Sequence, residues 1–129
     1  MSGSLPPPRI AGQADAEALF TGLSRWRREV MAVAYLDPEW RLLALRHVGG
    51  ERDHLALPIR SILRDVLAWE AARVVVAHNH PSGDAEPSDG DRAGTRQLAQ
   101  LLRAIDVTLV DHLVIGAGVV TSLRMRGAL

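Results

Sequence analysis

The apolar run at residues 73–77, with the sequence RVVVA, narrows the possible folds of this chain more than any other segment. Both faces of an extended chain with this sequence are apolar, so a strand formed here must be covered on both sides. Apolar residues also recur at helical spacing on either side of it, at residues 58–70 and 88–104. We therefore expect a buried central strand in a mixed sheet with helices on its faces, which is an α/β domain.

The remaining elements are expected to complete this sheet. Residues 1–12 are rich in Ser, Gly and Pro and have the composition of a flexible leader, and a short helix is expected at residues 15–23. The Asp37-Pro38 turn signal predicts a hairpin between the two strands that flank it. Strands are expected at residues 28–37, 40–48, 53–58, 107–116 and 118–124.

Composition excludes several kinds of chemistry. The 129 residues contain no Cys, which removes disulfides, thiol catalysis and every zinc site built on thiolates. All 15 basic residues are Arg, so neither a Schiff-base lysine nor a phosphate-binding lysine is present. A metal ion, if one is bound, must therefore be held by His and carboxylate side chains.

Net charge and hydropathy predict the location of the protein and its affinity for nucleic acids and membranes. The formal net charge is zero, whereas nucleic-acid binders usually carry a basic excess, so we expect nucleic-acid binding to be weak. The first ten residues do not have the pattern of a signal peptide, and no apolar run approaches the length of a membrane span. These features predict a cytoplasmic location without membrane association.

The polar segment HNHPSGDAEPSDGD, residues 78–91, directly follows the buried strand. His78 and His80 are two residues apart, so in an extended chain both imidazoles point to the same side and can converge on one ion. Asp91 is expected in the first turn of the next helix, where its carboxylate can turn back toward the strand end. Two imidazoles and one carboxylate leave one tetrahedral position open, as in catalytic zinc sites.

Simpler interpretations exist for the same residues. A His-x-His pair is often two ordinary histidines, and Ser88 with Asp91 has the spacing of a helix capping box. Capping is compatible with a metal site, since it also fixes the direction of the carboxylate. A general base would also be needed, and spacing alone leaves several candidates, of which Glu29 at the start of the first apolar strand is best placed. The candidates are Glu17, Glu29, Glu39, Glu51 and Glu70.

The segment resembles the JAMM signature of the MPN+/JAB metalloprotease family: a distant Glu, then His-x-His, then Ser-x-x-Asp. It is most similar to the RadC branch, in which His-Asn-His-Pro-Ser-Gly-Asp is followed by Pro-Ser-x-x-Asp. The segments REVMAVAYLD and DHLVIG, together with Thr95, Leu98 and Ser122, are also similar to that branch. The likeness runs from about residue 25 to the end of the chain. One departure is Ser61, which stands where the branch usually has a Glu.

The resemblance implies a curved mixed sheet flanked by helices, similar to the fold of zinc cytidine deaminases. It implies a RadC-like JAB domain at residues 25–129, which the leader and short helix expected from composition precede at residues 1–24. His78, His80 and Asp91 are then expected to bind one zinc ion, Glu29 to deprotonate water, and Ser88 to stabilise the oxyanion. The implied reaction is hydrolysis of a peptide or isopeptide amide bond.

Two other functions are alternatives to this hydrolase. A non-catalytic accessory role in DNA repair is the alternative that the RadC likeness suggests, but the neutral charge and the complete ligand and base set favour hydrolysis. A zinc nucleoside deaminase needs His-x-Glu and two cysteines, which are absent. No specific peptide or protein substrate and no oligomeric state is indicated. Ordinary surface positions are expected for His47, His54 and the group Arg25, Arg27 and Arg28, and His112 has no assigned role.

Overall fold

The computed structural model describes residues 9–49 and 57–129. The elements follow the chain as α1 (Gln13–Phe20), the 3-10 helix η1 (Thr21–Arg25), β1 (Val30–Leu36), β2 (Leu42–Gly49), α2 (Ile59–Trp69), β3 (Arg73–Asn79), α3 (Asp89–Ala104), β4 (Thr108–Ile115) and β5 (Val120–Ser122).

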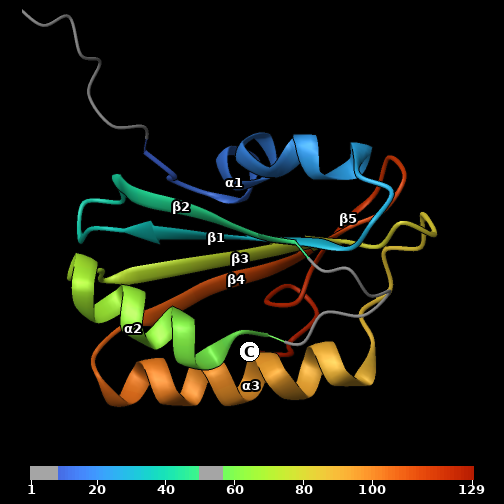
Figure 1. Cartoon of the computed structure of the whole chain (residues 1–129). Helices are drawn as coiled ribbons and strands as arrows, with labels where there is room; N and C mark the ends of the chain where they lie inside the picture. Colours follow the sequence, from blue (N-terminus) through green and yellow to red (C-terminus); the bar gives the residue numbers. More distant parts are fainter. Residues whose placement is uncertain (1–8, 50–56) are drawn as a thin grey trace, which may run out of the picture.

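Within the described residues, five strands form one mixed sheet in the order β2-β1-β3-β4-β5. Figure 1 shows β2, β1, β3 and β4 in succession. β1 pairs antiparallel with both β2 and β3, and β5 pairs antiparallel with β4. The pair β3 and β4 is parallel, because α3 carries the chain back across the sheet between them. The expected α/β fold with a mixed sheet is confirmed, and RVVVA forms its central strand.

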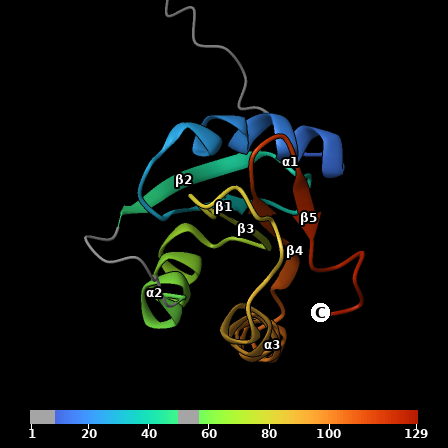
Figure 2. The same cartoon turned by 90° about the vertical axis from the view of Figure 1, so that its right-hand side faces the viewer.

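Helices cover both faces of this sheet (Figure 2). On one face, α1 and η1 pack through Phe20 and Leu23 against the alanines Ala32 and Ala77. On the other face, α2 and α3 pack through residues such as Leu98 against the opposite side of β1 and β3. Alternate residues of each central strand therefore enter separate cores, which explains why these strands are apolar on both faces. No helix in the described part of the chain is long and apolar enough to cross a membrane.

Element boundaries differ from the sequence-based expectation at a few positions. β3 continues two residues beyond 77 because His78 and Asn79 still pair with Val114 and Ile115 of β4. The expected helix at residues 15–23 is divided into α1 and η1. The hairpin of β1 and β2 is confirmed. The strand expected at residues 53–58 lies mostly outside the described residues, and its last two positions are not in a strand.

Candidate metal centre

Three elements bring the candidate site residues together. His78 is in β3 and His80 follows the strand directly, so both imidazoles lie on the face that α3 covers. Glu29 immediately precedes β1, and the pairing of Met31 with His78 places it beside β3. Asp91 lies in the first turn of α3. The C-terminal end of β3 and the N-terminal ends of β1 and α3 lie together, so residues distant in sequence meet there.

The side chains converge on a small buried space. The two Nε2 atoms of His78 and His80 lie 3.0 Å apart, and Asp91 Oδ2 is 3.4 Å from each of them. Glu29 Oε1 lies 3.8 Å from His78 Nε2. Glu29, His78 and His80 form a group whose ligand atoms all lie within 4.8 Å of one another and could hold a metal ion. Asp91 is equally close to both histidines. The two histidines could therefore bind a metal ion together with either Glu29 or Asp91.

A chain of hydrogen bonds fixes the tautomer of His78. The Thr95 hydroxyl donates to the Asp91 carbonyl oxygen, 2.5 Å away, so it must accept from His112 Nδ1, at 2.6 Å. His112 Nε2 is then the acceptor for His78 Nδ1, at 2.7 Å. Burial, more than the neighbouring His78, lowers the pKa of His112 to about 3, which agrees with a neutral ring. In the neutral form of His78, Nε2 therefore bears no hydrogen.

A single hydrogen bond fixes the tautomer of His80. Its Nδ1 lies 2.9 Å from the Asp84 carbonyl oxygen, which can only accept, so a hydrogen is on Nδ1 and, in the neutral ring, Nε2 is bare. When both rings are neutral, two unprotonated nitrogens face each other across 3.0 Å. Such an arrangement is repulsive unless a metal ion or a proton lies between the two lone pairs.

Asp91 adds negative charge to this space. Burial raises the pKa of its carboxyl, but the charge and hydrogen bond of His78 in its protonated form, together with the hydrogen bonds from Ser88, outweigh that effect and hold the pKa well below its usual range. The carboxylate is therefore ionised, and at 8% exposure it has little access to solvent. Its charge favours a cation at the centre of the cluster.

The predicted capping box is present and shares an atom with the site. Asp91 N donates to Ser88 Oγ at 3.0 Å, and Ser88 N donates to Asp91 Oδ2 at 2.8 Å. Asp91 Oδ2 is also the oxygen that faces the two histidines, so the cap sets the direction of the carboxylate. Ser88 is exposed, and its hydroxyl hydrogen is not used by the cap.

The loop after His80 is held against the turn between β4 and β5. His80 N donates to Ile115 O at 2.8 Å, and Ala117 N donates to Gly83 O at 3.0 Å. A Cβ atom on Gly116 would lie 2.3 Å from Gly83 O, so only glycine permits this approach. The contact fixes the loop whose Asp84 carbonyl orients His80.

The other candidate residues lie away from the site. Glu39 is in the turn between β1 and β2, Glu70 caps the C-terminal end of α2, and both are exposed. Glu17 belongs to α1, on the opposite face of the sheet. His47 is exposed on β2, as expected. Glu51 and His54 lie outside the described residues.

Sequence reasoning missed the supporting residues His112, Thr95 and Asn79. Each is at most 1% exposed and hydrogen-bonded to the segments that carry the site. The signal available in the sequence was a polar residue inside an apolar strand, since the segment DHLVI places Asp111 and His112 in β4. That signal indicates a buried polar role without naming its partner.

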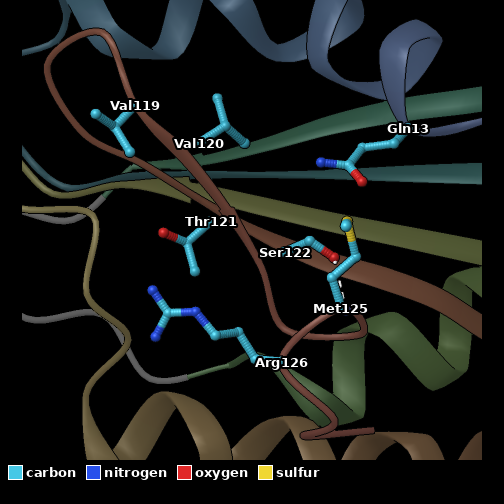
Figure 3. Close-up of a pocket in the computed structure, with 7 residues that line it drawn as sticks. All are labelled: Gln13, Val119, Val120, Thr121, Ser122, Met125 and Arg126. Carbon is cyan, nitrogen blue, oxygen red and sulfur yellow. Dashed lines mark hydrogen bonds between the residues drawn. The ribbon is translucent and has the colours of Figure 1, made fainter.

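A hollow of about 380 Å³ lies beside β5 and does not coincide with this cluster. Figure 3 shows it between the start of α1, β5 and the C-terminal segment. It is lined by Gln13, Val119, Val120, Thr121, Ser122, Met125 and Arg126. The candidate metal site is at the histidines, because none of the residues that line this hollow is His, Asp or Glu.

Known proteins match most of the chain. The RadC-like JAB domain family model matches residues 11–128. UPF0758 proteins of Alcanivorax borkumensis and Cellvibrio japonicus are 46% and 45% identical over 101 residues, which are 78% of this chain and 45% of each relative. A UPF0758 protein of Marinobacter nauticus is 41% identical over 120 residues, which are 92% of this chain and 54% of the relative.

The chain thus spans about half the length of these relatives. The match covers β1, β3 and α3, the three elements that carry Glu29, the two histidines and Asp91. On this evidence, the chain belongs to the RadC-like JAB domain family.

Proposed function

We propose that this domain is a zinc-dependent hydrolase of peptide or isopeptide amide bonds. One observation carries the proposal: two imidazole Nε2 atoms, whose rings each use Nδ1 in another hydrogen bond, face each other 3.0 Å apart beside a buried carboxylate. When bound there, a zinc ion would supply Lewis-acid chemistry that lowers the pKa of a water molecule and polarises an amide carbonyl.

The donor set fits zinc. Two ligands at a Zn–N distance of about 2.0–2.1 Å in a tetrahedral site lie about 3.3–3.4 Å from each other. The separations among His78 Nε2, His80 Nε2 and Asp91 Oδ2 are 3.0, 3.4 and 3.4 Å. Imidazole nitrogens combined with one carboxylate suit Zn²⁺ better than Mg²⁺ or Ca²⁺, which prefer oxygen ligands. We therefore assign these three residues as the ligands of one zinc ion.

Glu29 is the proposed proton carrier. Its carboxylate is buried and lies 3.8 Å from His78 Nε2, beyond direct hydrogen bonding but close enough to contact a water molecule beside the ligands. As general base it would take a proton from the attacking water and pass it to the leaving amine. This role requires that Glu29 is not itself a ligand, which the substitution below tests.

Ser88 is the proposed donor to the oxyanion. It is exposed at the N-terminus of α3, three residues from Asp91, and its hydroxyl hydrogen is free to donate toward a substrate carbonyl. The positive end of the helix dipole adds to this effect. The partner of the site would be a peptide or protein chain with an exposed amide bond.

The test combines metal analysis with cleavage of a peptide and isopeptide library. Purified protein is expected to contain about one zinc ion per chain. Glu29→Gln should keep that zinc and lower kcat by about 10²-fold or more, because only the proton acceptor is removed. Chelation should abolish cleavage, and zinc should restore it.

Glu39→Gln is the matched control, because Glu39 is exposed in the turn at the other end of β1 and should leave both zinc content and cleavage unchanged. Loss of zinc in Glu29→Gln would make Glu29 a ligand and require another base. Cleavage that survives both chelation and Glu29→Gln would contradict the proposal.

A further inference from the structure

The residue between the two histidines has a role that the ligand set does not explain. Asn79 is 1% exposed, and its side chain turns away from the histidines, because neighbouring residues of a strand point to opposite faces. Within the described residues, its side chain bonds to main-chain atoms of residues 26–30, the segment that leads into β1 and its first residue. Oδ1 accepts from Val30 N at 2.6 Å, and Nδ2 donates to Arg28 O at 2.9 Å and to Trp26 O at 3.1 Å.

These three bonds flank Glu29 on both sides. Arg28 precedes Glu29 and Val30 follows it, and both are held by the same amide group. The ladder between β1 and β3 reaches only the pair Met31 and His78. Past that pair, β3 and the residue after it bond to β4, with His80 N donating to Ile115 O. The Asn79 side chain therefore takes the place of the ladder in holding residues 26–30.

The Glu29 carboxylate depends on this backbone for its position. In residues 9–49 and 57–129, its one ion-pair contact is His78 Nε2 at 3.8 Å, which is too long to be a hydrogen bond. A side chain without close bonds of its own is located mainly by the Cα from which it extends. We propose that Asn79 is a positioning residue, whose amide fixes the main chain around Glu29 so that the carboxylate lies beside the histidines.

The chemistry of the amide is specific to this task. Asn offers one acceptor and two donors, and all three are used here. Asp at this position would keep the acceptor but turn an oxygen toward two carbonyl oxygens. Ser is too short to span the three main-chain groups. Both substitutions should therefore move the segment around Glu29 while leaving His78 and His80 attached to β3 and β4.

A spectroscopic test needs no substrate. The protein is labelled with ¹³C at the Glu carboxyl carbons and loaded with Co²⁺, whose paramagnetism shifts nearby nuclei. The Glu29 signal is assigned by its absence in Glu29→Gln. Asn79→Ser and Asn79→Asp should change the paramagnetic shift of Glu29 while about one Co²⁺ per chain is retained.

The matched control is Tyr35→Phe, which removes a buried hydrogen bond to Asp65 at the far end of the same strand and should leave the Glu29 shift unchanged. An unchanged Glu29 shift in both folded Asn79 variants would overturn the inference. If neither variant folds, hydrogen exchange in the unaltered protein decides. The Asn79 side-chain hydrogens should then exchange slowly, and rapid exchange would overturn it.

Kinetics connect this inference to the proposed function, on which the catalytic part of it rests. Asn79→Ser should lower kcat with little change in KM, because a misplacement of about 1 Å can cost about 10²-fold in rate. An equal decrease of kcat in Tyr35→Phe would show that Asn79 acts only through the stability of the fold. If the unaltered protein cleaves no amide, the proposed hydrolase fails, whereas the Glu29 shift still tests the positioning by Asn79.

Discussion

The two ends of β1 each carry a buried polar cluster, and the clusters differ in their balance of donors and acceptors. At one end, Tyr35 donates to Asp65 Oδ2 at 2.9 Å, and Arg46 Nε lies 2.7 Å from the same oxygen. At the other end, Glu29 meets the two histidines and Asp91. Asp65 and Asp91 are equally buried, at 7% and 8% exposure, so burial does not separate the two clusters.

The cluster around Asp65 is complete without a ligand. A hydroxyl and a guanidinium supply the hydrogens, and burial together with Asp65 raises the pKa of Tyr35, so its hydroxyl stays protonated. The cluster around Asp91 has the opposite composition, with two imidazole Nε2 atoms, bare when the rings are neutral, and two carboxyl groups directed at one space. A buried cluster of acceptors that lacks donors is a site for a cation, whereas a balanced cluster is part of the scaffold.

The largest expected difference between the clusters is in metal binding. His78→Ala should lose most of the zinc, because it removes one of the two imidazole nitrogens that lie 3.4 Å from the Asp91 carboxylate. Elemental analysis and thermal unfolding with and without added zinc measure this. Zinc should raise the Tm of the unaltered protein and leave that of His78→Ala unchanged, since only the native state binds the ion.

Asp65→Asn is the matched substitution at the other end of β1. It alters a carboxylate of equal burial, yet it should retain full zinc content. Full occupancy in His78→Ala, or equal loss of zinc in both variants, would remove the distinction between the two clusters.

A smaller effect is expected from the residues behind His78. His112→Leu removes the acceptor for His78 Nδ1, so the ring loses the bond that fixes its tautomer and orientation. Loss of such a supporting bond lowers metal affinity by about 10–100-fold. Thr95→Val should act in the same direction, because the hydroxyl orients His112.

Competition with a chromophoric chelator measures the affinity of these two variants. Leu98→Ala is the control, since it disturbs the same core at a fully buried position without touching the hydrogen-bonded chain. Affinity that falls equally in Leu98→Ala would show that packing alone supports the site.

How much of this could be read from the sequence depends on the range of each interaction. The buried strand, the His-x-His pair and the Ser88–Asp91 cap follow from periods of two and about 3.6 residues, which a single sequence shows directly. Glu29 could not be identified in this way, because residue spacing does not distinguish it from the other candidate glutamates. Its place beside His78 follows from the register of β1 with β3.

The supporting residues could not be predicted in the same way. His112 meets His78 only through the parallel pairing of β3 and β4, whose register shifts between Val74 and Val75. Asn79 bonds to main-chain atoms about 50 residues earlier in the chain, and no residue type marks such a partner. Interactions set by strand register and by main-chain acceptors are therefore the part that required the structure.

The cluster of Tyr35, Asp65 and Arg46 leads to a prediction on the stability of the fold. Tyr35→Phe should lower the free energy of unfolding by about 1 kcal/mol or somewhat more, because Asp65 loses a hydrogen bond but keeps Arg46. Chemical denaturation measures the change, and zinc content should stay the same. A change in zinc affinity would show that the two ends of β1 are coupled.

The surfaces at the two ends of β1 also differ, and this leads to the smallest expected effect. Near the turn end, Arg41 pairs with Asp37, and Arg73 lies 4.4 Å over the ring of Trp40. At the site end, the exposed residues Arg25, Arg27 and Arg28 form no ion pair within the described part of the chain. These three arginines are the place where a phosphate backbone would bind.

We predict that nucleic-acid binding there is weak and disappears near physiological salt. Three arginines neutralise at most about three phosphates, which gives a salt dependence of about −2.7 in log K against log salt for a duplex. The exposed acids Asp84 and Asp89 lie on the loop and helix beside the site and oppose the approach of DNA. Fluorescence anisotropy with labelled single- and double-stranded oligonucleotides, titrated across salt, measures this binding. Replacing the three arginines by Gln should abolish what remains at low salt. Tight binding at physiological salt, unchanged by chelation or Glu29→Gln, would instead favour a nucleic-acid accessory role over hydrolysis, because neither the metal nor the base would then serve the main activity.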